Sequence, residues 1–542
     1  MAVIDITTMR GETPRANPKL LAESQAVAAV NCHFRNGVIS PMKIEKDEAV
    51  TFKYSPTTIF LYKAGFWFTW LNDVDVIRSP VANDAYGRVY YTGDNYPKVT
   101  SADVATAGDG PYPATFYRLG VPTPVSAPVI VAVVPPDNPG DDDANDDETR
   151  FYTQTYVTRF GEEGAPSPAS AEVTIRYPGS AVDLSFESPA TQNSNIAYRR
   201  LYRSATSDTT ADFLLVAEIP INQLQYRDNV TDAGLSATLD TYDYTPPPSD
   251  MIGICMMSNG IAAGFHGNEV CFSEAFLPYA WKDSNKQTTE NTIVGIKPIG
   301  TTLVVGTEGR PYIFSGITPD NITSAEPLAT LACSSKGSMV AMDGYVLYAS
   351  PNGLVSIDGS GAAAVATKNI IDPTQWKSRY NPATIRAWLL EGEYFALFDD
   401  ADGVTSGFIF NPESMDFRHI QIDFNAAYNE PKTDTLYVAK AAKLFSVESG
   451  DMNRQLLWRS KPFIAQKDTS FSCLRIMADN PRLTGVRITV DGVQRVNIPP
   501  GTLTDRTIKI PSFSGKLWQV EVYGRAQVDR ITLSTSMAEM TA

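Results

Sequence analysis

The sequence predicts an all-β fold: a β-propeller of six or seven blades, an inserted β-sandwich and a C-terminal β-rich lobe. Three observations support this prediction. Hairpin-like units recur at about the 40–50-residue period of a four-stranded propeller blade. Short strands alternate with turn residues throughout, and the 37 prolines and 36 glycines are spread along all 542 residues. No segment has the apolar period of a long helix.

Residues 1–47 are predicted to form an N-terminal arm that packs on a neighbour or on the chain's own body. They lack strand alternation, and Pro14, Pro18 and Pro41 interrupt them. One short helical stretch is expected at residues 20–31.

Residues 48–119 are predicted to be the first part of the propeller. Residues 58–70, TIFLYKAGFWFTW, are dense in aromatic and β-branched side chains and carry one glycine at the expected turn. A second short strand is expected at residues 88–93. Together these segments supply one or two blades.

Residues 120–248 are predicted to be the inserted sandwich, because short alternating strands follow one another at sandwich-like spacing. They resemble a fibronectin type III-like module in the residues YVTRFGEEGAPS at 156–167, in the strand IAYRRLYR from Ile196, and in the closing Asp228. The resemblance implies a unit that binds or spaces rather than one that catalyses.

An acid-rich segment, residues 137–148, lies inside this insertion and leaves two interpretations open. Clustered carboxylates suit a hard cation such as calcium, but the ligand spacing of an EF-hand loop is not met, so a solvated loop is the simpler interpretation. The seven acids are Asp137, Asp141, Asp142, Asp143, Asp146, Asp147 and Glu148.

Three arginines of the insertion, Arg199, Arg200 and Arg203, are the nearest approach to a basic stripe for nucleic acid. In a strand, Arg199 and Arg203 share one face and Arg200 points to the other. We favour an edge strand blunted by charge.

Residues 249–460 are predicted to complete the propeller. Five hairpin units begin at Gly260, Thr301, Gly344, Gly392 and Asp434, each with Gly, Asn or Asp at its turn. Residues 461–542 contain several further short alternating strands, which predict a small sandwich or jelly-roll lobe.

A search for chemistry leaves the predicted sets of catalytic, cofactor-binding and metal-binding residues empty. The G-x-S-x-G elbow and the phosphate-binding loops are absent, and the three histidines, His33, His266 and His419, offer little material for a general base. Asp358 and Asp402, each followed by glycine, are interpreted as turn residues. A propeller can also gather paired acids, as glycosidases do, and the candidates near strand ends are Glu269, Glu274, Glu308, Asp343, Asp358 and Asp399. We predict a protein that is not an enzyme and uses no cofactor.

The net charge of −16 argues against a surface that grips phosphate backbones, because such a surface needs lysine and arginine. It suits a channel wall that a polyanion slides past. The five cysteines are far apart, so buried free thiols of a protein made in a reducing cytoplasm are expected. Residues 1–15 lack the apolar core of a secretory signal, and no apolar run reaches the roughly 18 residues of a membrane span.

Three stretches together resemble the tail nozzle (tail tubular protein B-like) proteins of short-tailed bacteriophages. The first is the opening, with RGETPR at residues 10–15, PKLLAESQAVAAVN at 18–31 and NGVISP at 36–41. The second is EVCFSEAFLPYAW at residues 269–281 together with the blades that follow it. The third is the ending, residues 516–540.

This resemblance implies a structural subunit of the virion tail, made in the cytoplasm of the host bacterium. Such proteins form a hexamer below the adaptor (head-to-tail) ring, extend the channel for DNA ejection, and anchor tail fibres or spikes. Double-stranded DNA would pass without sequence-specific binding, and no membrane insertion is expected. The alternative function is a phage receptor-binding or glycan-depolymerising tail protein.

Overall fold

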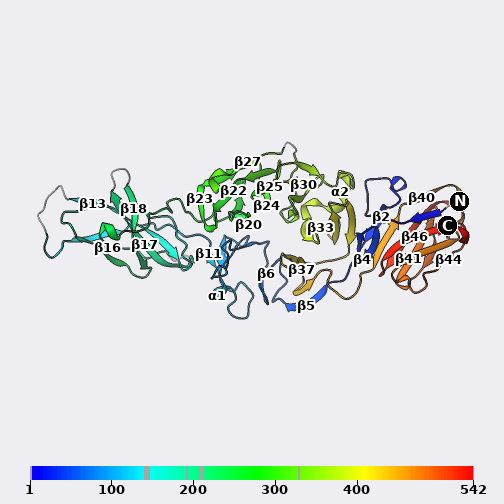
Figure 1. Ribbon diagram of the computed structural model, residues 1–542, viewed down its shortest axis with the longest axis horizontal. Helices are drawn as coiled ribbons and strands as arrows, with labels where there is room; N and C mark the ends of the chain where they lie inside the picture. The colour runs from blue at the N-terminus through cyan, green and yellow to red at the C-terminus, as the bar shows by residue number, and fades with distance from the viewer. Residues whose placement is uncertain (1–2, 140–146, 191–192, 207–210, 328–329, 541–542) are drawn as a thin grey trace.

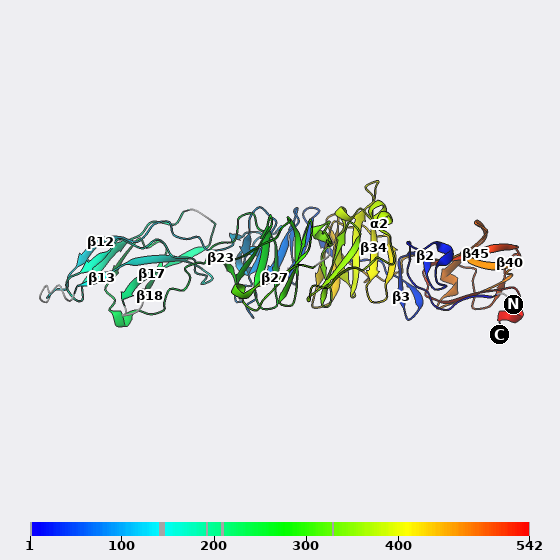
Figure 2. The same ribbon diagram turned by 90° about the horizontal axis from the view of Figure 1, so that it is seen from above.

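The computed structural model describes residues 3–139, 147–190, 193–206, 211–327 and 330–540. Three β-rich units lie in a row (Figure 1), with the sandwich at one end, the propeller in the middle and the lobe at the other end. Both termini lie in the lobe, and the view from above in Figure 2 shows the same order. The predicted fold class is therefore confirmed.

The propeller consists of seven sheets that follow one another around an axis. In ring order, the first two sheets consist of β6 (Thr58–Lys63) and β7 (Phe66–Trp70), and of β8 (Asp75–Arg78), β9 (Val89–Thr92), β10 (Lys98–Thr100) and β11 (Tyr117–Arg118). The next three consist of β20 (Ile252–Met256), β21 (Ala262–His266), β22 (Glu269–Glu274) and β23 (Leu277–Thr288); of β24 (Ile293–Ile299), β25 (Thr302–Thr307), β26 (Tyr312–Ser315) and β27 (Thr323–Ala325); and of β28 (Val340–Ala341), β29 (Tyr345–Ser350), β30 (Gly353–Asp358) and β31 (Ala363–Val365). The last two consist of β32 (Arg386–Leu390), β33 (Glu393–Asp399), β34 (Thr405–Asn411) and β35 (Asp416–Ile420), and of β36 (Ala426–Glu430), β37 (Thr435–Lys440), β38 (Lys443–Ser446) and β5 (Lys46–Thr51).

The ring closes through a strand from the N-terminal part of the chain. Strand β5 pairs antiparallel with β38, so the last blade combines residues about 400 positions apart in the sequence. The first strands of the blades face the axis, and contacts run from β6 to β36, β32, β28, β24, β20 and β8. The ring is complete only when both ends of the propeller sequence are present.

The insertion between β11 and β20 forms the sandwich. Its two main sheets have the strand orders β12–β16–β19 and β14–β17–β18, and β13 pairs with β15. The strands are β12 (Val129–Val134), β13 (Glu148–Arg150), β14 (Tyr152–Thr158), β15 (Val173–Ile175), β16 (Ala181–Ser185), β17 (Ile196–Thr206), β18 (Ala211–Pro220) and β19 (Gln225–Asp228). Buried side chains such as Tyr152, Leu184 and Leu201 fill the space between the sheets.

Residues 1–47 pack on the chain's own body, one of the two predicted alternatives, but the structure corrects the expectation that they lack strands. They supply β1 (Val3–Ile6), β2 (Ala26–Val30), β3 (Cys32–Arg35) and β4 (Val38–Pro41). The predicted helix at residues 20–31 is also wrong, because β2 pairs antiparallel with β39 (Leu456–Ser460) and parallel with β35. This pairing satisfies the backbone of β2 with distant strands, so local propensity does not decide its conformation.

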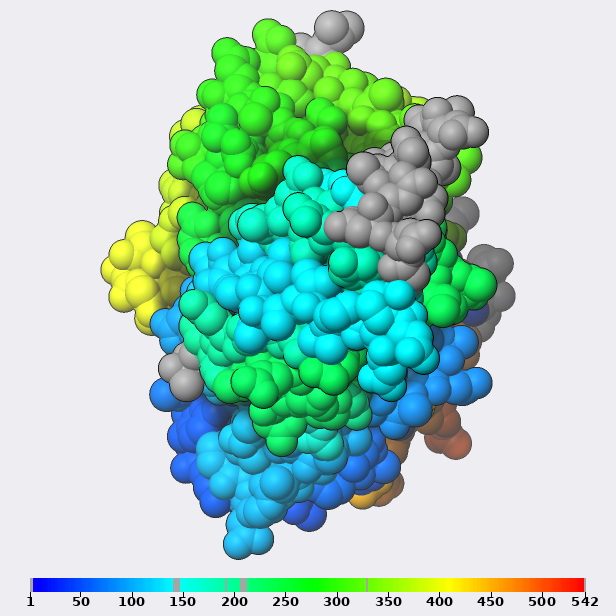
Figure 3. Space-filling view, turned by 90° about the vertical axis from the view of Figure 1, so that its left-hand side faces the viewer, coloured from blue at the N-terminus to red at the C-terminus, as the bar shows by residue number. Residues whose placement is uncertain are grey.

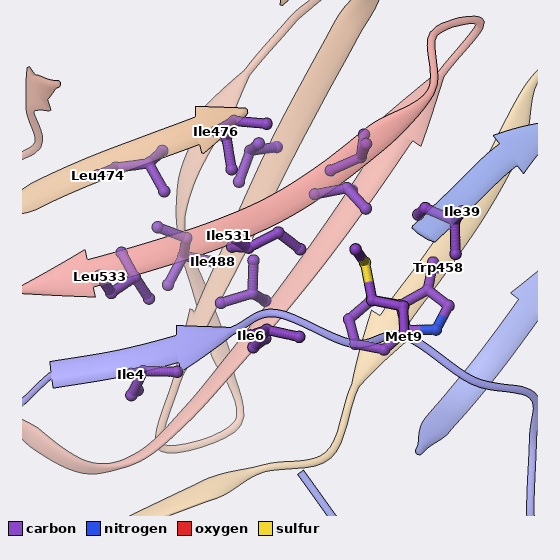
Figure 4. Close-up of a cluster of buried hydrophobic side chains, with 14 of the residues drawn as sticks. Ile4, Ile6, Met9, Ile39, Trp458, Leu474, Ile476, Ile488, Ile531 and Leu533 are labelled. Atoms are coloured by element: carbon purple, nitrogen blue, oxygen red, sulfur yellow. The ribbon is translucent and has the colours of Figure 1, made fainter. Parts of the chain in front are cut away.

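The lobe is a sandwich of two sheets. Its remaining strands are β40 (Phe463–Thr469), β41 (Cys473–Ala478), β42 (Thr484–Val490), β43 (Val493–Ile498), β44 (Ile508–Lys509), β45 (Gly515–Gly524) and β46 (Val528–Ser534). Figure 4 shows Ile4 and Ile6 of β1 beside Ile531 and Leu533 of β46, with Trp458 nearby. The N-terminal strand is thus part of the core of the lobe.

Helices are few and short. They are α1 (Ala102–Ala105), α2 (Pro373–Tyr380), and the 3-10 turns η1 (Pro18–Leu20), η2 (Asp232–Gly234), η3 (Pro319–Asn321), η4 (Lys336–Ser338), η5 (Pro382–Thr384), η6 (Pro481–Leu483) and η7 (Met537–Met540). Helix α2 starts at a capping Asp372, whose side chain accepts hydrogen bonds from the backbone N–H groups of Thr374 and Gln375. Within the described ranges, no helix has both the length and the apolar character that a bilayer span requires.

Candidate functional site

A pocket of about 590 Å³ lies on the axis of the propeller, and every blade contributes to its wall. Most of the contributing side chains come from the first strand of each blade or from the residues directly before it, whereas Asp399 is the last residue of β33, the second strand of its blade. Those used below are Thr58, Asp73, Asp75, Lys297, Lys336, Arg386, Trp388, Asp399, Asn425 and Ala427. Axial pockets of this kind are where the blades of a propeller can present side chains to one ligand.

An ion triad spans the pocket. The ammonium of Lys336, in η4 before β28, lies 2.9 Å from a carboxylate oxygen of Asp73 and 2.6 Å from one of Asp75. Asp75 is the first residue of β8, and Asp73 lies two residues before it. Two blades separate β8 from β28 on one side of the ring and three on the other, so the contact crosses the axis.

The pKa of Lys336 is raised in this setting. Burial alone would lower it, but the negative charges of Asp75 and Asp73 outweigh that effect. Lys336 is 22% exposed at its side chain, which leaves part of the triad accessible from the pocket. The triad is therefore a charged cross-link between two blades rather than a free acid–base pair.

Two further cations face the same pocket. Arg386 on β32 donates one hydrogen bond, at 3.0 Å, to the carbonyl of Asn425. Lys297 on β24 has no ion-pair or hydrogen-bond partner for its ammonium among the residues that the structure describes. Asp399 accepts a hydrogen bond from the hydroxyl of Thr405 at 2.8 Å. The pocket thus combines both signs of charge with the half-buried ring of Trp388.

The acids considered from the sequence do not gather in one place. Asp399 lines the axial pocket. Glu274 forms an ion pair with Lys282 at 3.1 Å, and Asp358 accepts hydrogen bonds from the backbone and hydroxyl of Ser360 at a turn. Those turn contacts lower the pKa of Asp358. The remaining three, Glu269, Glu308 and Asp343, belong to three different blades and do not line this pocket.

The three histidines are held by carboxylates at separate places. His266 lies 2.9 Å from Glu269 at the end of β21. His33 and His419 lie where the N-terminal segment crosses the propeller, at 3.0 Å from Glu448 and at 3.0 Å from Glu12, respectively. Among the described residues, no group of three or more His, Cys, Asp and Glu side chains could hold a metal ion.

The arginines of the insertion correct another prediction, since β17 is the central strand of its sheet and not an edge. Arg199 and Arg203 do share a face, but that face is fully buried. Arg203 is neutralised by Asp228 at 2.8 Å and Asp232 at 2.6 Å. Arg200, on the opposite face, pairs with Glu163 and Glu218. Arg199 instead donates hydrogen bonds to the side chain of Gln154 and to the backbone carbonyls of Glu187 and Ile221. Hydrogen-bond and ion-pair partners therefore explain how two of the three arginines are buried.

The acid-rich segment falls largely outside the described residues, which omit 140–146. Asp137 and Asp147 are described and exposed. The five cysteines are free and buried, as expected, and burial raises the pKa of Cys333 to about 12.

Sequence reasoning missed the triad of Asp73, Asp75 and Lys336. The first two stand in the segment NDVDVIR, where two aspartates lead into an apolar strand. That pattern is a weak signal of a charged strand start. Lys336 lies 263 residues away from Asp73, and no local pattern links them.

No protein-family model matches the chain, and no curated protein matches it either. Solved structures are matched at low identity and low TM-score. An exo-β-1,3-galactanase from Phanerochaete chrysosporium is 12% identical, with 52% of this chain and 95% of that chain covered and a TM-score of 0.22. The WD40 domain of Toxoplasma gondii coronin is 10% identical, with 60% and 78% covered and a TM-score of 0.26. The propeller assignment therefore depends on the strand pairing described above.

Proposed function

We propose that the chain is a structural subunit of the tail nozzle of a short-tailed bacteriophage and is not an enzyme. In this proposal it forms a hexamer below the adaptor ring, extends the DNA-ejection channel and anchors tail fibres or spikes. The motif order at residues 10–41, 269–281 and 516–540 supports it.

The observation that carries the proposal is that the sandwich, the propeller and the lobe lie in a row and are joined to one another (Figure 1). The N-terminal segment contributes strands to the lobe and closes the last blade of the propeller. Sheet pairing of β2 with both β35 and β39 makes the propeller and the lobe continuous. A structural subunit of a tail benefits from such a stiff connection, because separate domains on linkers move relative to one another.

The test is assembly with purified adaptor rings from short-tailed phages. The full chain should co-sediment with one of these rings as a larger particle, and negative-stain images should show an added ring. A chain that joins none of the rings tested, at concentrations well above those of a typical specific complex, would contradict the proposal.

A related expectation concerns DNA. With a net charge of −16, the chain should not retard double-stranded DNA in a gel at physiological salt, because a net-negative wall repels the phosphate backbone. Strong retardation would contradict the idea of a channel wall that lets DNA pass.

A second candidate function, glycan binding or cleavage by a tail protein, is favoured by the axial pocket. Carboxylates and an aromatic ring are the side chains that hold sugars, and Asp75, Asp399 and Trp388 all line that pocket. A reducing-sugar assay on host polysaccharide tests it. Turnover that disappears in Asp75→Asn or Asp399→Asn would establish an enzyme and overturn the purely structural proposal.

A further inference from the structure

The two ends of the molecule carry opposite net charge. The sandwich segment, residues 120–248, contains 19 acidic and seven basic residues. The segments that build the lobe, residues 1–44 and 451–542, contain 11 acidic and 18 basic residues. Figures 1 and 2 place these two units at opposite ends of the row. The net charge of −16 therefore hides a molecule with one acidic and one basic end.

Some basic residues of the lobe are in ion pairs, such as Arg530 with Asp5, but others are not neutralised by the described residues. Six exposed cations have no ion-pair partner among the residues that the structure describes. They are Lys467, Arg482, Arg495, Arg506, Lys509 and Lys516. Several lie on or beside the edge strand β43 and the short strand β44. Exposed charges of one sign that lack internal partners are available to an acidic surface of another molecule.

The acidic end has free carboxylates as well. Asp137 follows β12, Asp147 precedes β13, and Glu172 precedes β15. All three are exposed, and within the described ranges none is in an ion pair. Figure 3 shows the molecule from this sandwich end.

Exposed apolar side chains accompany both charged regions. On the sandwich, Val125, Val129 and Val131 are 86%, 55% and 60% exposed, and β12 is an edge strand of its sheet. On the lobe, Ile464 and Val493 are 59% and 49% exposed. A protein interface usually combines an apolar centre with a polar rim, and exposed apolar residues on an edge strand mark a place where another chain can dock.

We propose that the acidic sandwich end of one copy docks on the basic lobe of a second copy. The contact joins two different surfaces, so its repetition builds a ring when the rotation closes and a filament when it does not. This inference rests on the proposed ring assembly and deepens it by naming the two contacting surfaces.

The first measurement is sedimentation velocity of the full chain over a range of concentrations. Self-association should be strong in about 50 mM salt and weaken by at least about tenfold in about 300 mM salt, because salt screens exposed charges. A chain that stays monomeric at both salt concentrations overturns the proposal, as does a monomer whose lobe binds duplex DNA instead.

The second measurement swaps the charges. One variant carries Arg482→Glu, Arg495→Glu and Arg506→Glu, and the other carries Asp137→Lys, Asp147→Lys and Glu172→Lys. Each variant alone should self-associate more weakly than the unchanged chain, because the first lowers the net charge of the lobe segments from +7 to +1 and the second reduces that of the sandwich segment from −12 to −6. Mixed together they should associate more strongly than either alone, since the unchanged sandwich of the lobe variant fits the unchanged lobe of the sandwich variant.

A matched control carries three charge reversals on exposed propeller lysines, Lys368→Glu, Lys377→Glu and Lys432→Glu. It should self-associate as the unchanged chain does. Association as strong as that of the unchanged chain in both end variants overturns this contact while leaving the ring assembly standing. Failure to join an adaptor ring, with the charge-swap result intact, would instead overturn the nozzle function alone.

Discussion

Replacing Glu393 by glutamine is expected to lower the free energy of unfolding by about 3–5 kcal/mol, because it leaves a buried arginine without its counter-charge. The side chain of Arg418 is 1% exposed. Its Nη1 donates to Oε1 of Glu393 at 3.0 Å, and its Nη2 donates to the other carboxylate oxygen. The amide of glutamine keeps one acceptor but removes the charge, so the guanidinium stays buried and uncompensated.

The pH dependence of stability tests the ion pair of Glu393 and Arg418 in a second way. Burial raises the pKa of Glu393, but the hydrogen bonds and charge of Arg418 outweigh it, so the net pKa is lowered. A lowered pKa in the folded state means that the stabilisation is present above the ordinary carboxyl pKa of about 4.3 and is lost as pH falls through the folded value. The glutamine variant should lack this acid-side loss.

The assay is urea unfolding followed by intrinsic fluorescence, at neutral pH and on the acid side. The chain has three units, so transition midpoints are compared rather than a single two-state free energy. Glu391→Gln is the matched control: it changes the same chemical group in the same hairpin, but Glu391 pairs with the exposed Arg35. This control should leave the midpoint unchanged.

A double variant, Glu393→Met with Arg418→Met, should recover most of the loss, because a packed apolar pair often replaces a buried ion pair without cost. The reasoning is refuted if Glu393→Gln and Glu391→Gln behave alike, or if the double variant is less stable than Glu393→Gln.

Three further predictions follow from the same physical arguments. Lys336→Met should lower the thermal midpoint of the propeller, because it removes a partly exposed ion pair that contributes about 1–3 kcal/mol to the free energy of unfolding. The pKa of Lys336 is raised in the folded chain. The unchanged chain therefore keeps this stabilisation below pH ~10 and loses it only at higher pH. Gly524→Ala should destabilise the lobe severely, since φ is +139° and the new Cβ would lie 2.1 Å from the Leu483 carbonyl oxygen. The control Gly65→Ala, with φ +79° and no atom within 4 Å of the new Cβ, should lower the free energy of unfolding by only about 1 kcal/mol. A melting experiment compares the two variants. The five buried thiols should not react with a thiol reagent until denaturant is added; rapid reaction of any of them in the folded chain would contradict the burial described here.

Local patterns in the sequence were enough to predict most of the propeller. Each hairpin unit from Gly260 onward corresponds to paired strands, such as β29 with β30, because alternation and turn residues act over a few positions. The composition of residues 58–70 likewise predicted the hairpin of β6 and β7. The inserted sandwich and the lobe were recognisable for the same reason.

Pairing between strands and between charges that are distant in the sequence determines the features that local patterns do not predict. The local sequence predicts a short helix at residues 20–31, yet β2 is held between β35 and β39. The sequence predicts Arg203 on a charged edge strand, yet Asp228 and Asp232 allow it to be buried. In both cases the structure depends on a pairing partner that lies far away in the sequence, and local propensity does not reveal it.

The candidate site shows the same division most clearly. Each blade was predictable by itself, and the sequence also fixes the excess of acid in residues 120–248. The pocket on the axis exists only because ring closure by β5 brings seven first strands together. The contact of Lys336 with Asp73 and Asp75 across the axis joins two blades that the inserted sandwich separates in the sequence. Turn chemistry and strand alternation are encoded locally, whereas the pairing of buried charges depends on which distant strands the closed ring places opposite one another.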